Sequence, residues 1–281
     1  MSAKWWRFPA PAKLNLFLHV LGRRADGYHR LQTAFRFIDL CDEIHVRVRT
    51  DGVVRRITEL AGVPEDADLA VRAARLLQAC SGCRLGVDLR VDKRIPLGAG
   101  MGGGSSDAAT VLLALNRLWR LGLTRAQLQR LGLQLGADVP VFVFGRNAFA
   151  EGVGERLTAL DLKPAWYLVL QPQVAVSTAE IFSDPELTRN SRAITIAAFL
   201  EGQGRNDLEP VACRRHPEIA RHLVWLRQYA NAAMTGSGAC VFSAFETESE
   251  ARRVLGELPG GMRGMVARGL ERHPLYREDA E

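Results

Sequence analysis

The sequence lacks any apolar run long enough to cross a membrane, for which about 18 consecutive apolar residues are needed. The apolar stretch near the N-terminus, residues 14–21, is interrupted by Asn15 and His19, and no small-residue cleavage site follows it. We therefore expect a cytoplasmic protein that makes no contact with a membrane.

Cysteine is scarce, with Cys41, Cys80, Cys83, Cys213 and Cys240 making an odd total of five. Cys80 and Cys83 form one C-x-x-C pair, but a structural zinc site needs four ligands and no second pair stands at a matching spacing. The cysteine pattern therefore predicts reduced thiols rather than a disulfide framework or a zinc module.

A large excess of one charge is also missing. The 281 residues hold 37 Lys+Arg against 31 Asp+Glu, a net charge of +6 without a long basic run. This mild excess fits an anionic small molecule such as a nucleotide better than nucleic acid, which calls for clustered Lys and Arg with interleaved aromatics. With 47% hydrophobic and 24% charged residues, the chain is globular and long enough for two lobes or one large α/β domain.

Glycine, by contrast, is concentrated at one place, since five of the seven residues from 98 to 104 are glycine. Before this stretch, residues 85–91 alternate between apolar and more polar side chains, which predicts a strand. After it, apolar residues in 108–118 recur at helical spacing, and Ser105 or Ser106 is the expected N-cap. The predicted order is strand, glycine loop, helix.

Such a loop suits a phosphate group, because backbone N–H groups without neighbouring Cβ atoms can face the anion beside the positive end of a helix. The dinucleotide pattern G-x-G-x-x-G is matched, but no acid stands about 20 residues later, near 118–123. The Walker pattern fails because no Lys-Ser or Lys-Thr follows the last glycine. A mobile surface loop is the alternative without a function.

Closed by two serines, the loop resembles the phosphate loop of the GHMP kinases, the superfamily of galactokinase, homoserine kinase and mevalonate kinase. The resemblance implies ATP as the phosphoryl donor. Magnesium is expected with it. Because Mg²⁺ needs oxygen ligands and often keeps several waters, one serine hydroxyl besides the ATP phosphates can suffice, and Ser106 is the candidate ligand. The ATP-binding residues that the resemblance implies are Pro96, Leu97, Gly98, Ala99, Gly100, Met101, Gly102, Gly103, Gly104, Ser105 and Ser106.

A second region, residues 12–20, alternates like a strand and has Lys13 and Asn15 on the same face. Taken alone, it is well explained as a solvated edge strand, where lysine is common. A turn at 23–27 then leads into a second extended segment, residues 28–38.

These segments, together with 136–142 and 235–242, resemble one family within the GHMP kinases, which phosphorylates a cytidine diphosphate-linked methylerythritol. The resemblance covers nearly the whole chain. Residues 24–33 are the part that distinguishes this family, and therefore its substrate, from the rest of the superfamily. It implies Lys13 and Asp138 as catalytic residues, with Asp138 as the general base. The substrate-binding residues that it implies are Asn15, Tyr28, His29, Phe35, Thr178 and Phe182.

A physical argument for a base-binding site stands beside this resemblance. An aromatic ring offers a stacking face worth about 1–3 kcal/mol per base, and an adjacent imidazole can hydrogen-bond the edge of the base. We expect Tyr28 and Phe35 to sandwich the cytosine and His29 to contact its edge. From the residues alone, the alternative is that Tyr28 and Phe35 are core aromatics and His29 a satisfied loop histidine.

Asp138 lies between an expected helix end at Leu135 and an apolar run, 141–144, that we expect to form a strand. A carboxylate there is costly to bury without partners, although capping a turn would also explain it. By the resemblance, Asp138 takes the hydroxyl proton, Lys13 lies close to it and stabilises its charge, and Asn15 orients the acceptor.

Three further expectations concern the rest of the chain. The family has Asn before the leucine that starts helix 69–77, and that Asn lies near the nucleotide. This chain has Asp68, which can still cap the helix but to which the nucleotide contact is not carried over. The glycine turn at 235–240 is expected to pack against the active site. The charged tail, 271–281, is expected to fray.

The resemblance implies an α+β, two-lobed GHMP kinase fold with the active site in the cleft between lobes. A ribosomal-protein-S5-like N-terminal lobe, residues 1–160, would bind ATP, and a ferredoxin-like lobe, residues 161–281, would complete the cleft. The implied reaction phosphorylates the 2-hydroxyl of the acceptor in the methylerythritol phosphate route to isoprenoid precursors. The alternatives are a GHMP kinase for homoserine or mevalonate, and a non-catalytic nucleotide- or RNA-binding module. No nucleic-acid partner is expected.

Overall fold

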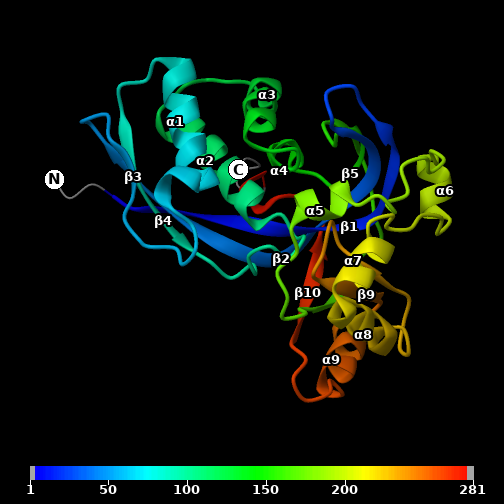
Figure 1. Ribbon diagram of the computed structural model, residues 1–281. Helices are drawn as coiled ribbons and strands as arrows, with labels where there is room; N and C mark the ends of the chain where they lie inside the picture. Colours follow the sequence, from blue (N-terminus) through cyan, green and yellow to red (C-terminus); the bar gives the residue numbers. More distant parts are fainter. Residues whose placement is uncertain (1–3, 277–281) are drawn as a thin grey trace.

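The computed structural model describes residues 4–276 and is organised around two long antiparallel strands, β1 (Trp6–Arg23) and β2 (His29–Arg49) (Figure 1). The extended segment expected around 28–38 is part of the one continuous strand β2. The pairing of β1 with β2 shifts register between Asn15 and Phe17, which marks a bulge beside the site described below.

Hydrogen bonds join the described strands into one ten-stranded sheet with the order β3-β4-β2-β10-β7-β9-β8, while β1 and β5 pair with β2 outside this path. β10 pairs with both β2 and β7, so it connects the strands of the first half of the chain to those of the second. The remaining strands are β3 (Val54–Arg56), β4 (Gly86–Asp92), β5 (Ala148–Gly152), β6 (Arg156–Ala159), β7 (Trp166–Leu170), β8 (Ala232–Met234), β9 (Val241–Phe245) and β10 (Gly264–Leu270).

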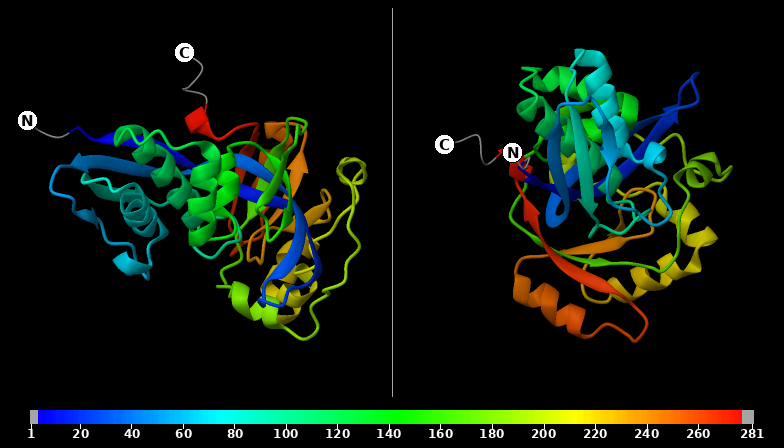
Figure 2. Two further views of the ribbon diagram at one scale, coloured as in Figure 1. Left: turned by 90° about the horizontal axis from the view of Figure 1, so that it is seen from above. Right: turned by 90° about the vertical axis from the view of Figure 1, so that its left-hand side faces the viewer.

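In Figure 1, helices α1 to α4 lie above the long strands, and α7 to α9 lie around β9 and β10. The turned views show the β1–β2 hairpin extending toward the yellow-green segments of the second half (Figure 2), where the Leu18 N–H donates to the Arg205 carbonyl. The helices are α1 (Leu69–Ser81), α2 (Gly103–Leu118), α3 (Arg125–Leu135), α4 (Val139–Phe144), α5 (Thr178–Ser183), α6 (Ile196–Leu200), α7 (Glu209–Arg215), α8 (Pro217–Leu226) and α9 (Glu248–Gly256), with short 3₁₀ turns at Glu65–Ala67 and Pro274–Tyr276.

Each half of the chain has its own apolar core. One joins β2 and β4 to α1, α2 and α4, and another joins β7 and β9 to α7 and α8, with Leu18 and Val20 of β1 reaching into it. This mixture of helices and sheet confirms the predicted α+β class, whereas the lobe boundary at residue 160 stays a prediction. No helix within residues 4–276 is long and apolar enough to span a membrane.

The predicted helix cap is confirmed, and a second helix has a capping box. The Asp68 carboxylate accepts a hydrogen bond of 2.9 Å from the Ala70 N–H at the start of α1. Thr124 and Gln127 form a capping box at the start of α3.

Two other predictions near the site are wrong. Gly102, in the left-handed region, is the N-cap of α2, so Ser105 and Ser106 lie inside the first turn. The expected strand after Asp138 is the helix α4, with Pro140 in its first turn. A short buried apolar run has no periodicity that separates strand from helix, whereas proline in the first turn is a helix-start signal.

The expected fraying of the tail is wrong for residues 271–276. The His273 side chain is fully buried, the His273 N–H donates to the Gly145 carbonyl at 2.9 Å, and Leu275 packs against the first core. The rest of that prediction, 277–281, lies outside the described residues.

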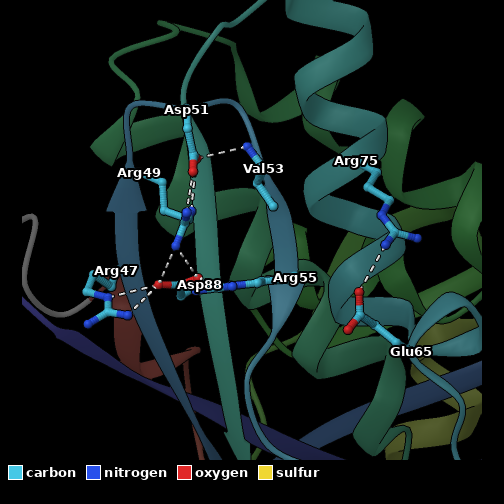
Figure 3. Close-up of polar contacts among 8 residues, drawn as sticks. All are labelled: Arg47, Arg49, Asp51, Val53, Arg55, Glu65, Arg75 and Asp88. Carbon is cyan, nitrogen blue, oxygen red and sulfur yellow. Dashed lines mark hydrogen bonds and ion pairs between the residues drawn. The ribbon is translucent and has the colours of Figure 1, made fainter.

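A charge network ties together β2, β3 and β4, the last of which leads into the glycine loop (Figure 3). The Asp88 carboxylate on β4 has no exposed surface and accepts hydrogen bonds from Arg47 and Arg49 of β2 and from Arg55 of β3. Burial alone would raise the pKa of Asp88, but the hydrogen bonds from Arg55 and Arg47 hold it below its usual value. The charged carboxylate therefore stabilises this end of the sheet.

Candidate active site

A cavity of about 420 Å³ lies where the glycine loop, β1, the start of α4 and the second glycine turn meet. Most of the predicted ATP-binding residues line it, namely Pro96, Leu97, Gly98, Ala99, Gly100, Gly102, Gly103, Gly104 and Ser105. Met101 and Ser106 do not line the cavity, and their side chains are buried. These two residues therefore hold the loop from behind rather than forming its open surface.

The glycine loop packs tightly against the second glycine turn, as expected. Gly100 has a φ of +74°, and a Cβ atom there would lie 2.2 Å from the Thr235 carbonyl oxygen. The Thr235 hydroxyl donates to the Gly100 carbonyl at 3.2 Å and accepts from the Asn15 N–H at 3.0 Å. The turn therefore fixes the position of the glycine loop relative to β1.

The two ends of the loop are joined by three charged residues, Asp42, Lys93 and Asp107, which we call the loop clamp. The Lys93 ammonium contacts Asp42 and lies 2.8 Å from Asp107 in α2. Asp42 also accepts hydrogen bonds of 2.6 and 2.8 Å from the N–H groups of Arg94 and Ile95. Burial raises the pKa of Asp107, while Lys93 opposes this shift. The clamp offsets part of the entropy lost when so many glycines are ordered.

Lys13 and Asp138 meet at the wall of the cavity. The Lys13 Nζ lies 3.2 Å from Asp138 Oδ2, donates to the Gly100 carbonyl at 3.0 Å and contacts the Asn15 amide oxygen. The Lys13 side chain is only 3% exposed, so a solvated edge strand is excluded, whereas the Asp138 side chain is 36% exposed. A buried ammonium thus connects the glycine loop to a carboxylate that remains open to the cavity.

The surroundings hold both groups in this orientation. Asp138 occupies the N-cap position of α4 but makes no side-chain capping bond, so its carboxylate faces Lys13 rather than its own helix. The Asn15 amide nitrogen donates to the Thr33 hydroxyl at 2.9 Å, which leaves the amide oxygen toward Lys13. All three polar side chains reach the cavity from elements that belong to the buried core.

A second cavity, of about 580 Å³, adjoins the first and has an aromatic lining. Tyr28, His29 and Phe182 contribute to its wall, and Thr178 and Phe182 line both cavities. Tyr28 is 63% exposed, while the rings of His29 and Phe182 stack with their centroids 5.1 Å apart. An elongated ligand can therefore extend from the glycine loop to these rings.

The predicted pairing of Tyr28 with Phe35 is wrong. Phe35 is 1% exposed, belongs to the first apolar core and lines neither cavity. It lies behind Lys13, whose ammonium is 5.5 Å from its ring centroid. Phe182, from the second half of the chain, is the aromatic side chain that faces the Tyr28 cavity in its place.

The site gives no support to Ser106 as a magnesium ligand, since its hydroxyl is fully buried and does not line the cavity. Within residues 4–276, three possible ligand residues gather only at Glu43, His45 and Asp92, and none of them lines either cavity. Asp92 is also bound by Arg90 through both of its oxygens. No group of three possible metal ligands within residues 4–276 therefore lies at the cavities, and the mechanism below uses no protein-held magnesium ion.

Four residues that build the site were not among the predicted ones: Lys93, Arg189, Thr235 and Ser237. Lys93 and Ser237 line the first cavity, and the Ser237 hydroxyl lies 2.7 Å from that of Thr178. Three of the four stand beside or within glycine-rich stretches, which is a signal in the sequence. No local pattern marks Arg189, because its contact with His29 joins residues 160 positions apart.

Two family models match this chain: the GHMP kinases N terminal domain over residues 68–146 and the GHMP kinases C terminal over 186–263. A 4-diphosphocytidyl-2-C-methyl-D-erythritol kinase from Nitrosospira multiformis is 62% identical over 95% of this chain and 92% of its own length. Its counterpart from Thiobacillus denitrificans is 63% identical over 96% of this chain and 97% of its own. The chain belongs to this family of GHMP kinases.

Solved structures agree with this family. A crystal structure of a 4-(cytidine 5'-diphospho)-2C-methyl-D-erythritol kinase matches with a TM-score of 0.81 and 37% identity, covering 94% of this chain and 99% of that one. A mevalonate kinase matches with a TM-score of 0.67 at 15% identity, over 94% of this chain and 99% of that one, which shows the shared fold alone. The predicted GHMP kinase fold is confirmed.

Proposed function

We propose that this GHMP kinase transfers the γ-phosphoryl group of ATP to the 2-hydroxyl of 4-diphosphocytidyl-2-C-methyl-D-erythritol, giving the 2-phosphate and ADP. The observation that carries the proposal is the Lys13–Asp138 pair, which lines the first cavity together with the glycine loop, while the aromatic cavity shares Thr178 and Phe182 with it. The names of relatives more than 60% identical over nearly the whole chain support it.

Phosphoryl transfer depends mainly on positioning and on stabilisation of charge. Asp138, the exposed member of the pair, accepts the hydroxyl proton while the acceptor oxygen attacks the γ-phosphorus and the bond to the bridging oxygen of ADP breaks. Lys13 stabilises the charge that develops on the transferred group, and Asn15 orients the acceptor. Backbone N–H groups of the glycine loop, between Pro96 and Ser105, hold the phosphates of ATP.

The cytidine end of the acceptor occupies the second cavity, with Tyr28 and Phe182 as stacking surfaces and Thr178 at the junction of the two cavities. The same proposal includes two lobes, residues 1–160 and 161–281, and a cytoplasmic location. It also includes magnesium that is bound with ATP rather than by the protein. If the chain phosphorylated homoserine or mevalonate, the aromatic cavity would have no function. If it were a non-catalytic binding module, the Lys13–Asp138 pair would have none.

The proposal is tested by ADP release from ATP and magnesium with the cytidine compound, with homoserine, with mevalonate and with no acceptor. We expect turnover with the cytidine compound alone. ADP released only with another alcohol would support a kinase activity but reject the cytidine compound as the acceptor. ADP released with none of them would favour the binding module.

Replacing Tyr28 with Ala should raise KM for the cytidine compound about tenfold or more, because one stacking face of the base is lost. The KM for ATP should stay unchanged, since Tyr28 does not line the first cavity, where the glycine loop lies. Steady-state kinetics with each substrate varied in turn provide the measurement. An unchanged acceptor KM would remove Tyr28 from the binding site.

A further inference from the structure

Arg189 connects the two walls of the aromatic cavity, although neither the sequence patterns nor the mechanism above uses it. Its Nη2 donates to the carbonyls of Phe182 and Asp184 at 2.9 and 2.7 Å, and its Nη1 donates to the Leu187 carbonyl at 3.2 Å. The Nε–H group donates to His29 Nε2 at 3.2 Å. The guanidinium is thus anchored on the backbone that carries Phe182 and reaches across to His29.

This contact determines where the proton of His29 lies. A guanidinium can only donate, so His29 Nε2 must accept, and the single ring proton of the neutral imidazole must be on Nδ1. Burial, followed by the charges of Arg189 and Arg23, lowers the pKa of His29 and so favours the neutral ring. Asp26, which also lines this cavity, is paired with Arg24 at 2.8 Å. His29 therefore presents one N–H donor, at Nδ1.

The pyrimidine bases differ in what they offer to such a donor. Cytosine carries an acceptor at N3 between its 2-oxo and 4-amino groups, whereas N3 of uracil carries a hydrogen and donates. A fixed N–H donor facing that position pairs with cytosine and opposes uracil, because two facing donors cannot form a hydrogen bond. A histidine free to change tautomer would accept from uracil N3–H equally well.

We propose that Arg189 is a positioning residue that fixes His29 as a hydrogen-bond donor through Nδ1 and thereby makes the kinase select a cytosine over a uracil nucleotide substrate. This inference rests on the proposed function, since it concerns the base of the same acceptor. It differs from a purely structural role for Arg189, which would support Phe182 and leave the preference between bases unchanged.

The test compares kcat/KM for the cytidine compound with kcat/KM for its uridine diphosphate-linked analogue. In the Arg189→Met variant we expect the cytidine-to-uridine ratio to fall about tenfold, as for the loss of one oriented hydrogen bond. Arg192→Met, which removes an exposed arginine three positions away, should leave the ratio unchanged. His29→Asn should also lower the ratio, because a side-chain amide can turn either its oxygen or its nitrogen to the base, while the carbonyl contacts of Arg189 are kept.

A direct measurement does not depend on turnover. Nitrogen-15 NMR of the histidine rings should show His29 protonated at Nδ1 in the wild type and a mixture of tautomers in Arg189→Met. The proposal is overturned by a wild-type proton on Nε2, or by an unchanged base ratio in His29→Asn that still turns over the cytidine compound. If the wild type uses no cytidine acceptor, the proposed function fails while the NMR result still decides the tautomer. Should Arg189→Met not fold, the wild-type spectrum and His29→Asn remain decisive.

Discussion

Replacing Asp138 with Asn lowers kcat by about 100- to 10,000-fold, the usual contribution of a general base. The amide keeps the size of the side chain but cannot take the acceptor proton, and the Lys13 ammonium 3.2 Å away loses its counter-charge. The affinity for ATP should change little, because the glycine loop that holds the phosphates is untouched. Single-turnover kinetics and an ATP titration by calorimetry separate the two effects.

The matched control is Asp161→Asn, which changes a carboxylate that is 95% exposed and paired with Arg146, away from both cavities. It should keep wild-type turnover. Wild-type kcat in Asp138→Asn would remove this residue as the base, and an equal loss in the control would point to a general effect of charge.

Replacing Gly100 with Ala should abolish tight ATP binding and cost roughly 2–4 kcal/mol of unfolding free energy. The added methyl group would lie 2.2 Å from the Thr235 carbonyl oxygen, which is backbone and cannot rotate away, at a φ of +74° that alanine disfavours. The glycine loop would have to move away from the second glycine turn, and the contact of Lys13 with the Gly100 carbonyl would move with it. Denaturant unfolding and ATP titration provide the measurements.

Gly98→Ala provides the matched control, because Gly98 also has a positive φ, of +64°, but a Cβ atom there meets nothing within 4 Å. Its cost should be limited to about 1–2 kcal/mol from the left-handed backbone. Equal effects in the two variants would mean that backbone conformation alone, and not the packing of the two glycine turns, determines the response.

Sequence patterns predicted the parts of the site that are local along the chain. The alternation around Lys13 and the capping carboxylate of Asp68 have periodic or local signals, and each lies in the expected kind of element. The glycine stretch predicted a loop followed by a helix, but α2 begins within the stretch, at Gly103. The run after Asp138 was predicted as a strand because a short, mostly buried apolar run carries no period.

Contacts between distant segments could not be predicted in this way. Phe35 and Phe182 both look like aromatic candidates in the sequence, but only the folded sheet places Phe35 in the core and turns Phe182 toward Tyr28. The same holds for Arg189 and His29, and for Asp42 and Lys93, whose side chains meet only because β2 pairs with β4 along its length.

If Asp138 and the glycine loop direct the γ-phosphoryl group to the 2-hydroxyl, the proton-coupled phosphorus-31 NMR spectrum of the product should show it. Carbon 2 of the acceptor bears a methyl group and no hydrogen, so a phosphate on the 2-hydroxyl has no proton three bonds away. We predict a new phosphomonoester signal that is a singlet, formed together with ADP. A doublet, from the 3-hydroxyl, a triplet, from the 1-hydroxyl, or no new phosphomonoester would contradict the account.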